Sequence, residues 1–397
     1  MFPSRRLLLF ASTMATVTPA LLVAAQQPTT PAIAMVRATS DTTSDTTYYV
    51  TNRERKAGRL GRTVGDSLEF GMLVTQFVER AGLTPSGRLL SALTSTQTDS
   101  VRLTRTEFLN VLIAANQRGS AMNDGTVFYV HGYATSFRRG VAQGAEIAHR
   151  GLFRGPMIVF AWPAHTALAT WPSAYAIISR AYRQDSALAV KSHDAFLAAL
   201  DAILDVTPAR SLTVVGHSLG AQLVAEALRG PSSVRDTLIA APLNALVFFA
   251  PDISAERFRD SLAVPMTSIA TRRIIYASTQ DRMLTISRLV NHSARAGQKG
   301  GERLLTGSNV EMVDVTRGRR AEGRLRALLD LKHAMRYAGS ALYDFFGVVR
   351  GLPAECRTQE RIIEQIGVNS WKLTNAPIPS ERTTCESPAP LQGGAAH

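Results

Sequence analysis

The sequence predicts an α/β fold in one domain, with a mostly parallel sheet between two layers of helices. Short runs of apolar, β-branched or aromatic residues, such as 125–133 and 243–251, alternate with stretches that have helical periodicity. These runs are predominantly apolar and do not alternate regularly with polar residues. Strands of that kind are buried on both faces, as they are in a parallel sheet covered by helices.

The expected elements begin near Tyr48. Strands are expected at 47–53, 68–77, 125–133, 156–163, 211–216, 243–251, 272–278 and 310–315. Helices are expected at 105–119, 137–150, 175–204, 221–229 and 331–347. Strands separated by helices in this order favour parallel pairing through crossover connections.

Residues 1–25 have the pattern of a secretory signal peptide: two arginines, an uncharged apolar stretch, and small residues before a cleavage site expected after Ala25. The stretch "SRRLLL" resembles a twin-arginine signal. The alternative is an uncleaved membrane anchor, because the apolar run approaches the roughly 20 residues that span a bilayer. Threonines and a proline inside the run favour cleavage, so we expect an exported protein, periplasmic or secreted.

Three further segments follow the signal. Residues 26–46 are rich in Ser, Thr and Pro without periodicity, which is typical of a flexible linker. The α/β domain is expected at 47–350, and a C-terminal extension at 351–397. Cys356 and Cys385 are the only cysteines, and in an oxidising compartment we expect them to form a disulfide; two unrelated thiols are the alternative.

The charge of the chain does not indicate a nucleic-acid partner. The formal net charge is +13 over 397 residues, but the arginines are scattered. The densest basic cluster, 317–332, has no aromatic side chains that could stack on bases, and its pattern is that of a solvated helix face. Weak association with an anionic membrane surface is the alternative. No internal repeat is present, and nothing in the sequence indicates an oligomeric state.

The stretch "GHSLG" places Ser218 between Gly216 and Gly220, after an expected strand and before an expected helix. This is the G-x-S-x-G nucleophile elbow, in which flanking glycines allow a sharp turn and expose the serine hydroxyl above the sheet. A serine in a turn without chemistry is the alternative. The strand and helix on either side favour the nucleophile.

A serine hydroxyl needs a base to take its proton, and in this chain order the acid and then the base follow the nucleophile. Asp281 comes after the strand 272–278 and is the expected acid, with Asp252 as the alternative acid, although Asp252 could instead cap a helix. His333, after the last expected strand, is the expected base. His292 precedes that strand and is a weaker candidate for the base. Local packing, capping or surface roles are expected for His149, His165, His193, His217 and Asp314.

The oxyanion formed during acyl transfer needs two amide donors. Leu219, directly after the nucleophile, is expected to supply one, and Tyr133, after His131 and Gly132 at a strand end, the other. No zinc, paired-cysteine or phosphate-loop motif is present, so no metal and no cofactor is expected. Aromatic side chains near a strand end either line an apolar pocket or belong to the core: Trp162, Trp171 and Tyr175.

With these motifs, the chain resembles the α/β-hydrolase superfamily, and within it a bacterial branch of unknown function. The resemblance extends over most of 47–347, through stretches such as "VFYVHGYATSF", "VFAWPAH", "VVGHSLGAQLVAEAL", "FFAPDIS" and "IIYASTQDRML". It implies a three-layer α/β-hydrolase fold with a triad of Ser218, Asp281 and His333 and no cofactor, and "GHSLG" is also similar to the elbow of lipases and esterases. The stretch "YATSF" after His-Gly departs from the usual pattern of the superfamily.

We therefore expect an exported carboxylesterase or lipase-like serine hydrolase that cleaves small-molecule or lipid esters through an acyl-enzyme. Two alternatives stay open. One is a non-catalytic envelope protein that uses the hydrolase scaffold for binding or structure. The other is an amidase or thioesterase with the same triad.

Overall fold

The computed structural model describes residues 40–83, 89–164, 174–298, 309–316 and 339–374. Its strands are β1 (Ser40–Lys56), β2 (Arg59–Leu83), β3 (Leu89–Gln97), β4 (Val101–Leu103), β5 (Thr126–Val130), β6 (Met157–Phe160), β7 (Leu212–His217), β8 (Leu243–Phe249), β9 (Ala270–Ala277), β10 (Glu311–Asp314), β11 (Ile363–Gly367) and β12 (Ser370–Leu373). Its helices are α1 (Arg105–Ala121), α2 (Phe137–Arg150), α3 (Ala174–Lys191), α4 (His193–Leu204), α5 (Leu219–Arg229), α6 (Ser233–Ala240), α7 (Ala255–Arg257), α8 (Ala263–Met266), α9 (Arg282–Asn291), α12 (Gly339–Val349) and α13 (Ala354–Gln359), with a 3₁₀ turn η1 (Ala209–Ser211) and a π-helical turn η2 (Phe258–Leu262).

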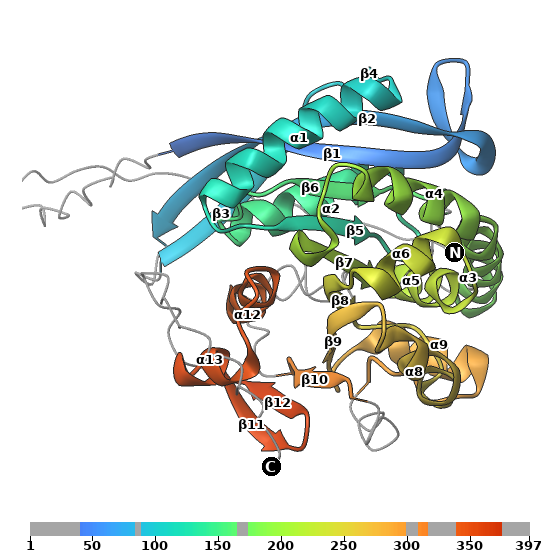
Figure 1. Ribbon diagram of the computed structural model, residues 1–397, viewed down its shortest axis with the longest axis vertical. Helices are drawn as coiled ribbons and strands as arrows, with labels where there is room; N and C mark the ends of the chain where they lie inside the picture. The colour runs from blue at the N-terminus through green and yellow to red at the C-terminus, as the bar shows by residue number, and fades with distance from the viewer. Residues whose placement is uncertain (1–39, 84–88, 165–173, 299–308, 317–338, 375–397) are drawn as a thin grey trace, which may run out of the picture.

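One sheet runs through the molecule in the order β11-β12-β10-β9-β8-β7-β5-β6-β1-β2-β3, with β4 paired to β2 (Figure 1). Every pairing from β12 to β1 is parallel. Antiparallel strands extend both edges. The prediction of a mostly parallel sheet is therefore confirmed.

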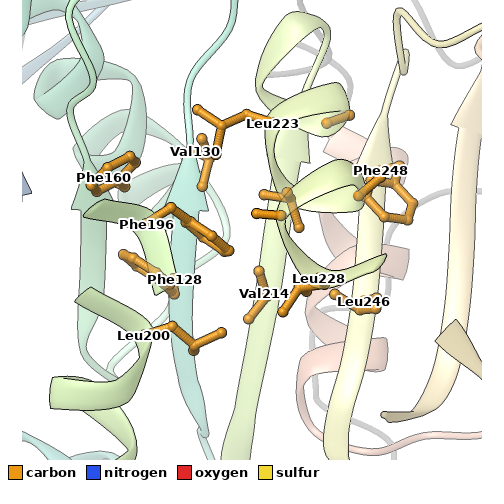
Figure 2. Packing of buried hydrophobic residues seen from close by; sticks show 14 of the residues in the cluster. Phe128, Val130, Phe160, Phe196, Leu200, Val214, Leu223, Leu228, Leu246 and Phe248 are labelled. Carbon is orange, nitrogen blue, oxygen red and sulfur yellow. The ribbon is translucent and has the colours of Figure 1, made fainter. Parts of the chain in front are cut away.

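The central strands are buried on both faces and feed two cores. On one face, Phe128 and Val130 of β5 pack with residues of α4 and α5, as Figure 2 shows. On the other, Val127 and Tyr129 of the same strand pack with residues of α2 and α12. The alternation along one strand places helices on both sides of the sheet, which explains the continuous apolar runs in the sequence.

The order of the strands reverses direction beside β5. From β5 the chain passes through α2 to β6 on one side, and after α3 and α4 it returns to β7 on the other side. The loops that leave β5 and β7 therefore diverge at the carboxyl ends of two adjacent parallel strands. In open α/β sheets, ligands bind at such a crevice.

The N-terminal hairpin is longer than the sequence predicts. β1 already covers 40–46, which the sequence predicts as linker, and β2 extends well beyond both ends of the expected strand at 68–77. The turn at Ala57 and Gly58 has positive φ at both residues, 46° and 77°, which suits the twist of a two-residue hairpin. The expected helix at 175–204 is interrupted at Ser192, between α3 and α4.

The segment after residue 350 continues the sheet, since β12 pairs with β10 and β11 pairs with β12. The buried Arg357 guanidinium binds this segment to α12 by donating to both carboxylate oxygens of Asp344, at 3.1 and 3.0 Å. Cys356 is also buried, but Cys385 lies outside the described residues, so their disulfide stays a prediction. Within the described residues, no helix is long and apolar enough to span a bilayer.

Candidate active site at the carboxyl edge of the sheet

Ser218 lies in the turn between β7 and α5, with φ 55° and ψ −119°. This left-handed region is unfavourable for a serine. A Cβ on Gly216 would lie 2.5 Å from Ala221 Cα, and one on Gly220 would lie 2.3 Å from the His131 carbonyl oxygen. Both neighbours must therefore be glycine, as a nucleophile elbow requires.

Three backbone hydrogen bonds hold this strained turn. The Ser218 amide donates to Phe249 O at 2.9 Å, while the Ser218 carbonyl accepts from the amides of Ala221 at 3.0 Å and Asp252 at 3.1 Å. Strain of this kind persists only where the surroundings determine the conformation. Because β8 and the loop after it supply two of these bonds, the position of Ser218 is fixed from outside the motif.

The loop after β5 lies directly against this turn. A Cβ on Gly132 would be 2.9 Å from Ser218 Cβ and 3.0 Å from the His217 carbonyl oxygen. Among the described residues, the amides of Tyr133 and Leu219 have no hydrogen-bond acceptor. Leu219 is the first residue of α5, whose N-terminal amides and dipole favour negative charge. The structure thus brings together Ser218 and the two loops predicted to supply the oxyanion donors.

Side chains that the sequence analysis did not single out hold the loop after β5. The buried Arg53 donates to Ala161 O at 3.1 Å and to Thr135 O at 2.9 Å. Asp185 of α3 accepts from the Ala134 amide at 2.9 Å, and Ala134 has a φ of 53°. Burial lowers the pKa of Arg53 to about 10, so it stays charged at neutral pH. The sequence signal that could have indicated this role is an arginine, Arg53, in a part of β1 where the neighbouring residues are buried.

Trp162 belongs to the core. It is fully buried, its indole N–H donates to the His131 carbonyl at 2.7 Å, and its ring stacks on the His131 ring with centroids 5.5 Å apart. Trp171 and the side chain of Tyr175 lie outside the described residues. The Tyr133 ring is 6.0 Å from that of Tyr182, and burial raises the pKa of Tyr133 to about 12.

The two candidate acids differ in what they bind. Asp252 forms a buried ion pair with Arg295, whose Nε lies 2.6 Å from Oδ1, and the same oxygen accepts from Ser287 Oγ at 2.6 Å. Asp252 does not cap a helix, the alternative role considered for it, since Ser254 caps α7. Asp281 is 2% exposed and caps α9, with Oδ1 accepting from the Leu284 amide at 3.0 Å.

The start of the segment that carries His333 lies beside the Asp281 turn. Val315, directly after β10, donates its amide to Ala277 O at 2.8 Å, and the Thr279 amide donates to Thr316 Oγ1 at 3.0 Å. Residues 317–338, including His333, lie outside the described residues. The contact between Asp281 and His333 therefore stays a prediction.

The other candidate residues lie on the surface, pack locally, or lie outside the described residues. His292 is exposed at the C-terminal end of α9, and Asp281 lies at the N-terminal end. The ten residues of this helix span about 15 Å, so His292 is far from Asp281. His149 stacks on Phe77 and lies 2.9 Å from an oxygen of Asp45. The remaining candidates are His193 at the start of α4, His217 against Gly132, Asp314 accepting from the Thr316 amide, and His165, which is outside the described residues.

Among the described residues, no group of three or more His, Cys, Asp or Glu side chains is arranged to hold a metal ion. What the arrangement offers is a serine hydroxyl in a strained turn and, beside it, two amides without an acceptor among the described residues. Buried carboxylates follow the next two strands along the sheet edge, Asp252 after β8 and Asp281 after β9.

The solved structures that match this chain share little sequence with it, and their TM-scores are low. An alpha/beta hydrolase enzyme, MGS-M1, from a Medee basin deep-sea metagenome library is 12% identical over 73% of this chain and 92% of its own, with a TM-score of 0.28. A fungal esterase from Rhizomucor miehei is 12% identical over 70% and 83%, with a TM-score of 0.30. The esterase Est22 is 11% identical over 77% and 80%, with a TM-score of 0.33.

No curated protein shows significant sequence similarity to the chain. Residues 113–323, more than half of the chain, match the family described as "Alpha/beta hydrolase of unknown function (DUF900)". The matched region includes β5, the turn at Ser218, and the strand ends that carry Asp252 and Asp281. The chain belongs to this family of α/β hydrolases, as its sheet and the resemblance in its sequence led us to expect.

Proposed function

We propose that the protein is a serine hydrolase that cleaves ester bonds through an acyl-enzyme intermediate. The observation that carries the proposal is the position of Ser218: a serine with φ 55° in a strand-to-helix turn, within contact distance of Gly132 and next to two amides without acceptors among the described residues. Backbone strain at a serine next to such donors is typical of a nucleophile.

In the proposed reaction, Ser218 Oγ attacks the ester carbonyl carbon while His333 takes the hydroxyl proton. The carbonyl oxygen becomes an oxyanion that accepts from the amides of Leu219 and Tyr133. The C–O bond to the alcohol then breaks, and His333 returns the proton to the leaving alcohol. A water molecule repeats the sequence on the acyl-enzyme, releasing the acid and restoring Ser218.

We assign the acid of the triad to Asp281. Asp252 is already paired with the buried guanidinium of Arg295, which would compete with an imidazole for the carboxylate. Asp281 follows β9, and β10 ends beside that turn and leads into the segment that carries His333. The first residues of that segment thus leave the sheet next to Asp281.

The proposal is tested with p-nitrophenyl acetate and its amide and thioester analogues, using wild-type protein and Ser218→Ala. We expect wild type to cleave the ester fastest and Ser218→Ala, with an unchanged circular dichroism spectrum, to lose that activity. Ester hydrolysis retained by Ser218→Ala would overturn the proposal. Faster cleavage of the amide or thioester would indicate an amidase or a thioesterase instead of an esterase.

Export is the second part of the proposal. It rests on residues 1–25, which match a signal peptide, and on Cys356 and Cys385, which an oxidising compartment would allow to pair. After expression of the full chain in a bacterial host, we expect a mature protein that begins at Gln26 outside the cytoplasm. Recovery of the chain with its N-terminus intact in the membrane fraction would favour the anchor instead.

A further inference from the structure

His131 is a fully buried histidine at the end of β5, two residues before one of the proposed oxyanion donors. Its ring is stacked on Trp162, and α2 approaches it closely, since a Cβ on Gly140 would lie 2.6 Å from His131 Cδ2. The ring therefore has a single well-defined orientation in the core.

The His131 ring makes one hydrogen bond within the described residues, and that bond is with the peptide group between Gly132 and Tyr133, in the loop after β5. Nδ1 lies 3.0 Å from the carbonyl oxygen of Gly132. A carbonyl oxygen can only accept, so Nδ1 must carry the proton. In a planar trans peptide the C=O and the next N–H point in opposite directions. Holding the Gly132 carbonyl toward the ring thus turns the Tyr133 N–H away from it.

The surroundings allow one protonation state of this ring. Nε2 is buried and has no partner among the described residues. A proton there would place an unsatisfied donor and a positive charge in the core, near the guanidinium of Arg53. Burial and this guanidinium lower the pKa of His131 to about 3. The imidazole is therefore neutral with its proton on Nδ1, the tautomer that free imidazole side chains populate less.

The residues on either side of Tyr133 are fixed as well. Trp162 donates to the carbonyl of His131, Asp185 accepts from the amide of Ala134, and Arg53 donates to the carbonyl of Thr135. The Tyr133 amide, between these contacts, has no acceptor within the described residues. These contacts fix the backbone before and after Tyr133 and leave its N–H available.

We propose that His131 is a positioning residue for the reaction: its Nδ1–H holds the Gly132–Tyr133 peptide in the orientation that presents the Tyr133 amide to the substrate oxyanion. This inference rests on the proposed function of Ser218. It adds a role for a buried side chain that does not touch the substrate. The hydrogen bond also polarises the peptide and strengthens the Tyr133 N–H as a donor.

Two substitutions separate this role from packing. In His131→Asn, the side-chain amide nitrogen can occupy the place of Nδ1 and donate to Gly132 O; in His131→Phe, the ring stacks on Trp162 without a donor. We expect His131→Phe to lower kcat by about 100-fold with KM little changed, and to lose affinity for a trifluoromethyl ketone, which forms an oxyanion on Ser218. We expect His131→Asn to keep kcat within about tenfold of wild type.

A purely structural role would give both variants a lower melting temperature but the wild-type kcat per serine labelled by a fluorophosphonate. That result would overturn the proposal. The ¹⁵N spectrum of histidine-labelled wild type, assigned with His131→Asn, gives an independent readout that needs no activity and no folded His131→Phe. A protonated Nδ1 and an unprotonated Nε2 at His131 are expected; the reverse tautomer would refute the inference even if Ser218 proves to be the nucleophile.

Discussion

Replacing Gly132 by alanine tests the contact between the loop after β5 and the turn that carries Ser218. The added methyl group would lie 2.9 Å from Ser218 Cβ and 3.0 Å from His217 O, whereas ordinary contacts begin near 3.4 Å. Neither atom is at the end of a flexible side chain. The loop and the turn must therefore separate by about 0.5 Å.

That separation is enough to remove one oxyanion donor. Such donors act at about 2.7–3.1 Å from the oxyanion, so a shift of about 0.5 Å moves the Tyr133 amide to about 3.2–3.6 Å, at or beyond the limit of a hydrogen bond. Loss of one donor costs about 100- to 1,000-fold in kcat, or about 3–4 kcal/mol of transition-state stabilisation. We expect Gly132→Ala to lose kcat by this factor while KM changes little, because the oxyanion exists only in the transition state and intermediate.

The assay is hydrolysis of p-nitrophenyl acetate, with kcat expressed per serine labelled by a fluorophosphonate so that unfolded protein does not count. Gly230→Ala is the matched control: Gly230 directly follows α5, and an added Cβ there meets nothing within 4 Å. The control should keep the wild-type kcat. A Gly132→Ala enzyme with kcat within threefold of wild type, a margin on the order of 0.7 kcal/mol, would refute the assigned loop contact.

Three further predictions concern the acids and the buried histidine. Asp281→Asn should lower kcat by about 10⁴-fold because the imidazole loses its orienting carboxylate, yet urea unfolding should change by less than about 1 kcal/mol, since asparagine also caps helices. Asp252→Asn should do the reverse, lowering the free energy of unfolding by about 3 kcal/mol because Arg295 stays buried without its counter-charge, while kcat per labelled serine stays near wild type. His131 has a pKa of about 3 when folded and 6.5 as the ordinary value, so the unfolded chain binds the extra proton and stability falls as pH falls from 6.5 toward 3. Urea titrations should show wild type losing about 2–3 kcal/mol more than His131→Asn between pH 6.5 and pH 4.5.

Each of these predictions has an outcome that contradicts it. If Asp252→Asn abolished kcat and Asp281→Asn did not, the assignment of the two acids would have to be exchanged. Equal pH dependence of unfolding in wild type and His131→Asn would mean that this histidine is not held neutral by the fold.

The parallel core could be predicted because burial on both faces leaves an apolar signature in each strand. Strands such as 243–249, with every residue buried, are recognisable without any tertiary information. The hairpin that begins at residue 40 could not be predicted in full, because its first part, "SDTTSDTT", is polar and acquires its strand conformation by pairing with β2. The same holds for β11, which lies at the opposite edge of the sheet and is mostly exposed.

At the candidate site, the turn at Ser218 and the loop that begins at Gly132 could be predicted to lie together because the elbow and the strand before Gly132 are local features. The choice between the acids depended on Arg295, which reaches Asp252 across 43 positions of sequence. The contacts of Arg53 span 82 positions to Thr135 and 108 to Ala161. Pairings at such separations exist only in the folded chain, so periodicity and local motifs could not indicate them.

The central claim, that Ser218 is a nucleophile, is tested most directly by locating a covalent adduct. The full protein is treated with a fluorophosphonate, digested, and sequenced by mass spectrometry, with Ser218→Ala and heat-unfolded wild type as controls. The adduct is expected on the peptide that contains Ser218 in folded wild type and in neither control. Folded wild type that carries no adduct, or carries it on another serine, would contradict the claim.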